Sequence, residues 1–237
     1  MNGSGKGIFY SIIGLATMII AFIGASYAYF TVAAVPDTET IAGQSNDTLS
    51  GALSLSITKV DLGGTATSGD NLVPADFGSS FLPNDITTTN INKALTSKCV
   101  QGGYTGCHVW KIEATTTQTV TNANINLSLT ATKSEANTSG TLIPWSYVVY
   151  TGTDTTATNL ITVPSGSSAA GSFGTGLSNL DINNNTSIST TGKTYYLMVY
   201  INNADSTQNN GATDVRASYT GTVTFEAAGG QVKATFG

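Results

Sequence analysis

The sequence predicts an all-β protein: a jelly-roll-like β-sandwich preceded by an N-terminal hydrophobic helix. Three observations predict this class. Apolar and polar residues alternate with the two-residue period of half-buried strands in several runs after residue 36. Thr and Ser occupy 39 and 24 of the 237 positions, and Thr is favoured in strands. Stretches rich in Gly, Ser, Thr and Asn separate the runs, as turns do in sandwiches.

The composition excludes several functional classes. Charged residues make up 10% of the chain, against about 25% in an average globular domain. The net charge is −5 and the isoelectric point about 4.6, so the cationic surface that neutralises nucleic-acid phosphates is missing. Two Cys and one His are too few for a zinc cluster. Hydrophobic residues, at 40%, are sufficient for a packed core.

Residues 1–28 are expected to form a signal peptide or a retained helix. Lys6 precedes an uncharged stretch over 8–30, and the small residues Ser26 and Ala28 fit a cleavage site before Tyr29. The 23 residues of 8–30 are also long enough to span a bilayer of about 30 Å, as a transmembrane helix, or to form a filament core. Both interpretations place the rest of the chain outside the cell, either secreted or on the cell surface.

The segment that follows is a candidate donor strand over 29–36. It is apolar, prone to form a strand, and stopped by Pro36. Laid into the sheet of a second copy, it would add main-chain hydrogen bonds and give an open head-to-tail filament. The alternative is the first strand of its own sandwich. The donor residues are Tyr29, Phe30, Thr31, Val32, Ala33, Ala34 and Val35.

Residues 37–237 are expected to form a single sandwich domain. Two runs, 145–150 and 195–201, are apolar on both faces and are therefore predicted to be central strands. A short helix is expected within 83–95. The other predicted strands begin with the alternating residues of 53–58 and continue at 109–114, 124–131, 217–225 and 232–236.

The two cysteines are predicted to form a disulfide. Cys99 and Cys107 flank a turn-rich stretch that brings them together as a hairpin, and the expected compartment is oxidising. Closing so short a loop should stabilise the fold by about 2–3 kcal/mol. The alternative is a redox pair, but the spacing is far from Cys-x-x-Cys.

The sequence contains no convincing catalytic site, so no enzyme activity and no cofactor are expected. His108, the only histidine, is expected to point to solvent or to satisfy a local hydrogen bond. The glycine-rich run 171–176 lacks the Lys of a phosphate loop and is interpreted as a flexible turn. No metal site is predicted, although Asp205 and Asp214, with Asn209 and Asn210, are candidate calcium ligands.

Two ends of the chain resemble the TasA/camelysin family of biofilm fibre subunits. Residues 24–31, Gly-Ala-Ser-Tyr-Ala-Tyr-Phe-Thr, resemble the end of a signal peptide of the SipW type. Residues 46–56 resemble the first strand of that family, and residues 217–227, which end in Phe-Glu-Ala, resemble its last strand. The resemblance implies a jelly-roll subunit of an extracellular fibre, joined by an N-terminal donor strand. Val32, where the family often has Asp, and the loop from Cys99 to Cys107 depart from it.

The expected function is therefore structural: a subunit of a surface filament or biofilm matrix fibre whose partner is a further copy of itself. The cell envelope or membrane is a second expected partner, and nucleic acid is not. A pilin-like subunit is the first alternative, with a leader ending at Gly7 and the helix in the filament core; Ile12 stands where bacterial pilins have Glu. A membrane-tethered adhesin is the second.

Overall fold

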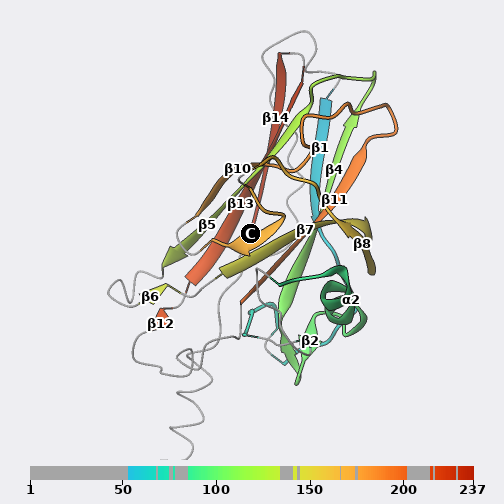
Figure 1. Cartoon of the computed structure of the whole chain (residues 1–237). Coiled ribbons are helices and arrows are strands. Elements are labelled where there is room, and N and C mark those ends of the chain that lie inside the picture. Colours follow the sequence, from blue (N-terminus) through green and yellow to red (C-terminus); the bar gives the residue numbers. More distant parts are fainter. Residues whose placement is uncertain are drawn as a thin grey trace, which may run out of the picture.

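The structure is a computed structural model. It describes residues 53–67, 69–74, 77, 85–133, 141–142, 145–165, 167–173, 176–201, 214–215, 217–227 and 229–237. In this part of the chain the protein is all-β, with two antiparallel sheets and one short helix (Figure 1). The leader at 1–28 and the candidate donor strand at 29–36 lie outside the described residues.

The larger sheet has six strands. Its order is β1 (Leu53–Lys59), β4 (Cys107–Thr116), β11 (Lys193–Ile201), β7 (Trp145–Thr153) and β8 (Thr156–Leu160), with β9 (Ala170–Ser172) pairing the other half of β7. The prediction that 145–150 and 195–201 form central strands is confirmed, because β7 and β11 each have a strand on both sides. The side chains on both faces of these two strands are buried, as expected for strands at the centre of a sheet that is covered on both faces.

The smaller sheet has four strands, in the order β10 (Leu177–Asp181), β5 (Asn124–Lys133), β13 (Ala217–Ala227) and β14 (Gly230–Phe236). From β4 to β13 the successive long strands alternate between the larger and the smaller sheet. As a result, β4 and β11 are neighbours in the larger sheet, and β5 and β13 are neighbours in the smaller one. Two small pairs complete the described strands: β2 (Val100–Gln101) with β3 (Tyr104–Thr105), and β6 (Thr141–Leu142) with β12 (Asp214–Val215).

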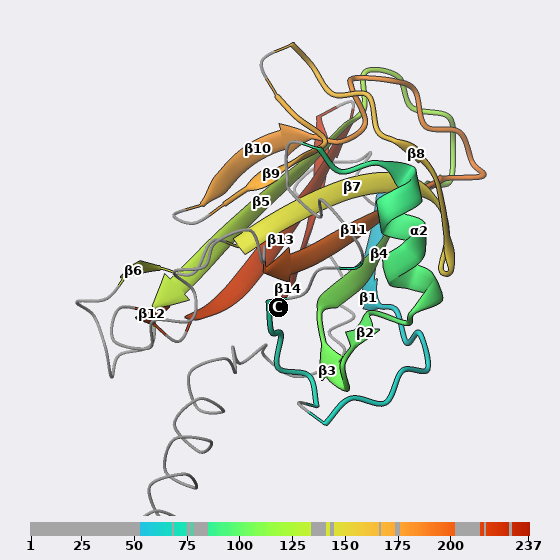
Figure 2. The ribbon, with the colours of Figure 1, turned by 60° about the horizontal axis from the view of Figure 1, so that its bottom comes forward.

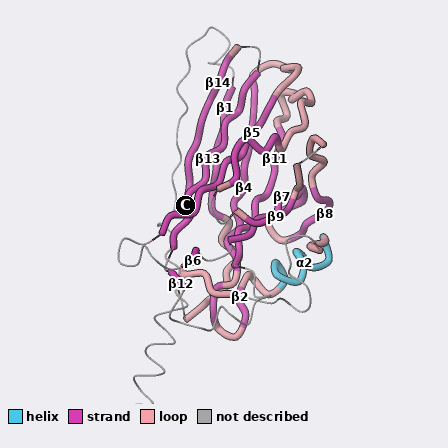
Figure 3. The backbone as a smooth tube through the Cα atoms, turned by 60° about the vertical axis from the view of Figure 1, so that its left-hand side comes forward, coloured by secondary structure: helices cyan, strands magenta, loops and turns pink. Residues whose placement is uncertain are grey.

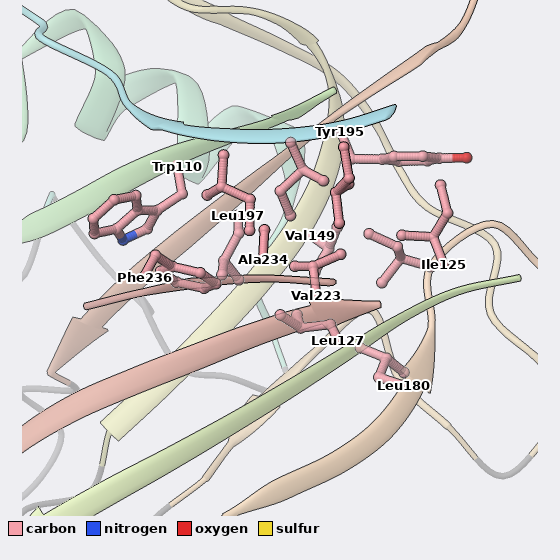
Figure 4. Packing of buried hydrophobic residues seen from close by; sticks show 14 of the residues in the cluster. Trp110, Ile125, Leu127, Val149, Leu180, Tyr195, Leu197, Val223, Ala234 and Phe236 are labelled. Carbon is pink, nitrogen blue, oxygen red and sulfur yellow. The ribbon is translucent and has the colours of Figure 1, made fainter. Parts of the chain in front are cut away.

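The two sheets pack face to face over an apolar core (Figure 4). Along β5 and β13 every second residue points inward, which is the alternation that the sequence predicted. The inward rows include Ile125 and Leu127 from the smaller sheet, and Val149, Tyr195 and Leu197 from the larger one. Burial of these rows is the main stabilising term of the fold.

Part of the outer face of the larger sheet is covered by the helix α2 (Thr88–Thr96), as Figure 2 shows. The short helix predicted within 83–95 is thus confirmed. Thr87 caps it by accepting a hydrogen bond from the backbone N–H of Asn90. Ile91, Ala94 and Leu95 form its buried face and pack in a second core with residues of β4, β7 and β11.

One glycine is required by the packing between the sheets. Gly221 on β13 pairs with Phe236 on β14, and the aromatic ring lies over the glycine. A Cβ at position 221 would come within 2.1 Å of that ring. The same phenylalanine ring meets Trp110 at a centroid distance of 4.8 Å, so this glycine allows an aromatic contact between the two sheets.

No helix of the described chain is long and apolar enough to cross a membrane. The uncharged stretch 8–30 lies outside that part of the chain.

Candidate functional site

The cysteine pair closes a loop between α2 and β4. Cys99 and Cys107 are joined as a disulfide with their Cα atoms 5.1 Å apart, and both are buried. The backbone N–H of Cys99 donates to the carbonyl of Ala94, which anchors the loop to the last turn of the helix. The loop itself holds the β2–β3 hairpin. The covalent link therefore holds α2 against the outer face of the larger sheet.

A cavity of about 670 Å³ adjoins this loop. The segment following β1 and the β2–β3 hairpin line it, together with both cysteines and His108. Lys59 and Asp70 form an ion pair of 2.8 Å in its wall, and the hydrogen bond from Lys59 lowers the pKa of the Asp70 carboxyl. Two further charged residues of the wall bond backbone groups instead: Asp61 accepts from the backbone N–H of Gly63 at 2.7 Å, and Lys98 donates to the carbonyl of Gly63 at 3.2 Å.

His108 does not point to solvent, and this part of the sequence expectation is wrong. The side chain is 2% exposed and lies on the inner face of β4. Its Nδ1 lies 2.9 Å from the hydroxyl of Tyr219 on the opposite sheet, and its Nε2 lies 2.8 Å from the carbonyl of Asp70. These partners are 111 and 38 residues away in the chain, so the bonds are not local either.

The hydrogen bonds and the burial of His108 together favour a neutral ring. The carbonyl of Asp70 only accepts, so Nε2 carries a proton, and in the neutral ring Nδ1 is then an acceptor. Trp110 Nε1 donates to the Tyr219 hydroxyl at 2.9 Å, and that hydroxyl donates in turn to Nδ1. Burial lowers the pKa of His108 to about 4, with a further contribution from the nearby charge of Lys59. A histidine held neutral, with both nitrogens occupied, is a structural link between the two sheets.

Asp181 and Asn183 are residues that sequence analysis missed. The Asp181 carboxylate accepts hydrogen bonds from the backbone N–H groups of Asn183, Asn184 and Asn185, at 3.0 and 3.1 Å. The Asn183 side chain is buried at the centre of a polar cluster with Lys193 and Tyr195. The pattern Asp-x-Asn-x-Asn at 181–185 was the available signal, since such residues bond their own turn.

Among the described residues no group of three His, Cys, Asp or Glu side chains is close enough to hold a metal ion. Asp205, Asn209 and Asn210 lie outside the described residues, and Asp214 is described only as a backbone position of β12.

The first part of the glycine-rich run, 171–173, differs from its interpretation as a flexible turn, while 174–175 lie outside the described residues. Gly171 and Ser172 belong to β9, and Phe173 is 1% exposed in the main core. Tyr147 stands over Gly171 across the strand pair, where a Cβ would lie 3.2 Å from the tyrosine ring. The glycine therefore serves aromatic packing, which local sequence does not reveal.

The sheet edges offer positions where an additional strand can bind. In the described part of the chain, β1, β14, β10 and the β8–β9 edge each pair on one side only. β1 and β14 lie side by side (Figure 3). On the opposite edge of the smaller sheet, β10 pairs β5 only over 126–129, with a register shift, while β13 pairs β5 as far as Lys133. Backbone groups of such edges are available to an extended segment.

Comparisons with known proteins found no match: no family model, no curated protein and no solved structure matches the chain.

Proposed function

We propose that this protein is a structural subunit of an extracellular surface filament or biofilm matrix fibre. In this proposal the leader is removed and the mature chain starts at Tyr29. Residues 29–35 of one copy then add as a strand to a sheet edge of the next copy. The partner is the same chain, the assembly is an open polymer, and no catalysis is involved.

The observation that carries the proposal is the pair of antiparallel sheets with edges that pair on one side only. An extended segment gains main-chain hydrogen bonds along such an edge, and alternate side chains enter the space between the sheets. The candidate donor has seven residues, as do the edge strands β1 and β14. The 17 residues of 36–52 connect it to β1 and can span at most about 60 Å when extended, enough to reach a neighbouring copy.

The composition of the chain favours a polymer held by backbone pairing and apolar contacts. With charged residues at 10% of the chain, electrostatic attraction between copies has few groups to act on. Burial of Tyr29, Phe30, Val32 and Val35 would contribute about 25 cal/mol per Å² of apolar area, opposed by the cost of ordering the segment. The alternation of long strands between the two sheets supports a jelly-roll-like sandwich as the architectural class.

The proposal is tested by placing a charge in the donor strand. Val32→Asp should abolish filaments seen by electron microscopy while the monomer keeps the circular dichroism spectrum of the wild type, because a carboxylate in the joint would be buried without a partner. Thr38→Asp is the matched control, since it adds the same charge beyond Pro36. Filaments of normal length from Val32→Asp would refute the donor strand.

Cysteine cross-linking identifies the edge that receives the strand. Val32→Cys is combined in turn with Ser54→Cys on β1, Thr235→Cys on β14, Asn179→Cys on β10 or Ser172→Cys on β9. We expect intermolecular disulfides with one of these edges. Thr222→Cys, on the outer face of β13, is the control position and should give none. Equal cross-linking at all five positions would show non-specific contact instead.

The N-terminal residue of the protein recovered from cells separates this proposal from the two alternatives. An intact mass that starts at Tyr29 supports the donor-strand filament. A start at Ile8 would support the pilin-like subunit with a helical core. A retained Met1 would support the tethered adhesin or an unprocessed filament, and would contradict the donor-strand mechanism.

A further inference from the structure

The turn between β10 and β11 holds an amine against a buried amide. The Asn183 side chain is 3% exposed, and the Nζ atom of Lys193 lies 2.9 Å from its Oδ1. Lys193 and Tyr195 are two residues apart on β11, so both side chains leave the same face of the strand. Both side chains therefore reach the side chain of Asn183.

The amide of Asn183 is fixed in orientation. Its Nδ2 donates to the backbone carbonyls of Ala123 and Thr186, which only accept. Its Oδ1 receives the hydroxyl of Tyr195 at 2.8 Å and lies 2.9 Å from the hydroxyl of Thr186. Hydroxyl groups aimed at a carbonyl oxygen are the arrangement that stabilises negative charge developing on that oxygen.

The backbone of the turn is also held in place. Asp181 binds three successive N–H groups, and Asn184 and Asn185 adopt positive φ angles of 51° and 52°, which asparagine tolerates. The position of Asn183 relative to β11 is therefore set before any reaction. Such pre-organisation replaces much of the entropy cost of bringing two groups together.

We propose that Lys193 and Asn183 form an intramolecular isopeptide bond. The bond would join the turn after β10 in the smaller sheet to β11 in the larger sheet, and so tie the two layers covalently. It would be a second covalent link in addition to the disulfide of Cys99 and Cys107, in a different part of the fold.

The reaction needs only groups that are present. The neutral amine of Lys193 attacks Cγ of Asn183, and the carbonyl electron pair moves onto Oδ1, where the hydroxyls of Tyr195 and Thr186 stabilise it. When the carbonyl re-forms, the bond between Cγ and Nδ2 breaks. The leaving nitrogen takes the proton that Nζ gives up and departs as ammonia. One C–N bond forms and one breaks, so no oxidant or cofactor is consumed.

The surroundings favour the reactive form of the amine. Burial lowers the pKa of Lys193, which increases the neutral fraction relative to an exposed lysine. Tyr195 keeps its proton, because burial and the charge of Asp181 raise the pKa of its hydroxyl. The attacked side chain is a neutral amide, so no ion pair has to be broken.

The test is a mass measurement on the full chain after denaturation and reduction. The bond should lower the mass by about 17 Da, the mass of one ammonia molecule. It should also block trypsin after Lys193, so that one peptide covers 134–216 with that deficit, because Lys133, Lys193 and Arg216 are the consecutive cleavage sites in this region. A full sequence mass with complete cleavage after Lys193 would overturn the proposal.

Two controls separate this bond from other losses of ammonia. A cyclic imide of Asn183 with its own backbone has the same mass deficit, but it leaves Lys193 open to trypsin and would also overturn the proposal. Lys193→Arg keeps the positive charge but should restore the full mass. Lys233→Arg, on an exposed position of β14, should keep the deficit. The wild-type peptide map decides the matter even if Lys193→Arg does not fold.

Discussion

Two polar clusters lie on the inner face of the larger sheet at opposite ends of β11, and they differ in how their hydrogen-bond donors and acceptors are matched. Near one end, His108 pairs with Val199 in the ladder and bonds Tyr219 and Asp70. At the other end, Lys193 and Tyr195 meet Asn183. The first cluster satisfies neutral groups only, one donor for each acceptor. The second places an amine and two hydroxyls around a single amide oxygen.

The comparison shows that a buried polar group can serve as a structural link or as a reactive one. In the His108 cluster each polar hydrogen of His108, Trp110 and Tyr219 has an acceptor, and no nucleophile lies beside an electrophilic carbon. In the Asn183 cluster the Tyr195 hydroxyl and the Lys193 amine both donate to Oδ1, so the amine lies beside the carbonyl, and the Thr186 hydroxyl lies 2.9 Å from both Oδ1 and the backbone carbonyl oxygen of Asn183. Substitutions that remove one centre at a time test this difference.

The largest effect is expected from Asn183→Ala. The substitution would remove the acceptor of the buried Tyr195 hydroxyl and the donor of two backbone carbonyls, while the half-buried Lys193 keeps the Thr186 hydroxyl as an acceptor; we expect a loss of about 4 kcal/mol of unfolding free energy. Chemical denaturation measures this loss. Ser187→Ala, in the exposed part of the same turn, should cost less than about 0.5 kcal/mol. Equal stability of the two variants would show that the Asn183 cluster is not a centre of the fold.

The His108 cluster should make stability depend on pH, with the next largest effect. The ordinary pKa of histidine is 6.5, and the value in the folded protein is about 4. Between these values the unfolded state binds a proton that the folded state does not, so stability rises with pH and is lost as pH falls from about 6.5 to about 4. The total loss is about 3 kcal/mol.

Urea titrations at several pH values measure this dependence. His108 is the only histidine, so the slope between pH 5 and 6.5 should flatten in His108→Gln. The other groups that face the ring are Lys59, Asp70 and Tyr219. The pKa of Asp70 is lowered from 3.8 and that of Tyr219 is raised, so neither titrates in that window. An unchanged slope in His108→Gln would contradict the assignment.

Sequence pattern predicted the parts of the fold that depend on local periodicity. The central position of β7 and β11 followed from runs without a polar face, and the short α2 was expected within 83–95. The state of the cysteines followed from their spacing and the expected compartment. Each of these features is determined by residues close together in the chain.

The two clusters escaped prediction because they depend on which strands face each other. His108 meets Tyr219 only because β4 and β13 lie in opposite sheets, and 111 residues separate the two side chains. Likewise, Asn183 looked like one of many turn asparagines until β11 placed Lys193 and Tyr195 beside it. Periodicity shows that a residue points inward, but it does not show what stands opposite.

The smallest of the effects is expected from Tyr219→Phe, which separates the hydrogen bonds of the His108 cluster from its packing. The ring stays between Trp145 and Phe173, with centroid distances of 5.0 and 6.5 Å, but the hydroxyl that links Trp110 to His108 is lost. A donor and an acceptor are then left unpaired in the core, at a cost of about 2 kcal/mol. Tyr147→Phe, which loses one bond to the carbonyl of Ser168, is the matched control and should cost about 1 kcal/mol. Thermal unfolding compares the two.

Because Tyr219→Phe removes the acceptor of Trp110 but no titrating group from the pH window, it should lower the stability at every pH between 5 and 8 while leaving the His108 slope in place. A cost at low pH alone would mean that the hydroxyl acts only through the charge state of His108, and the two sheets would then be linked by packing rather than by the hydrogen bonds.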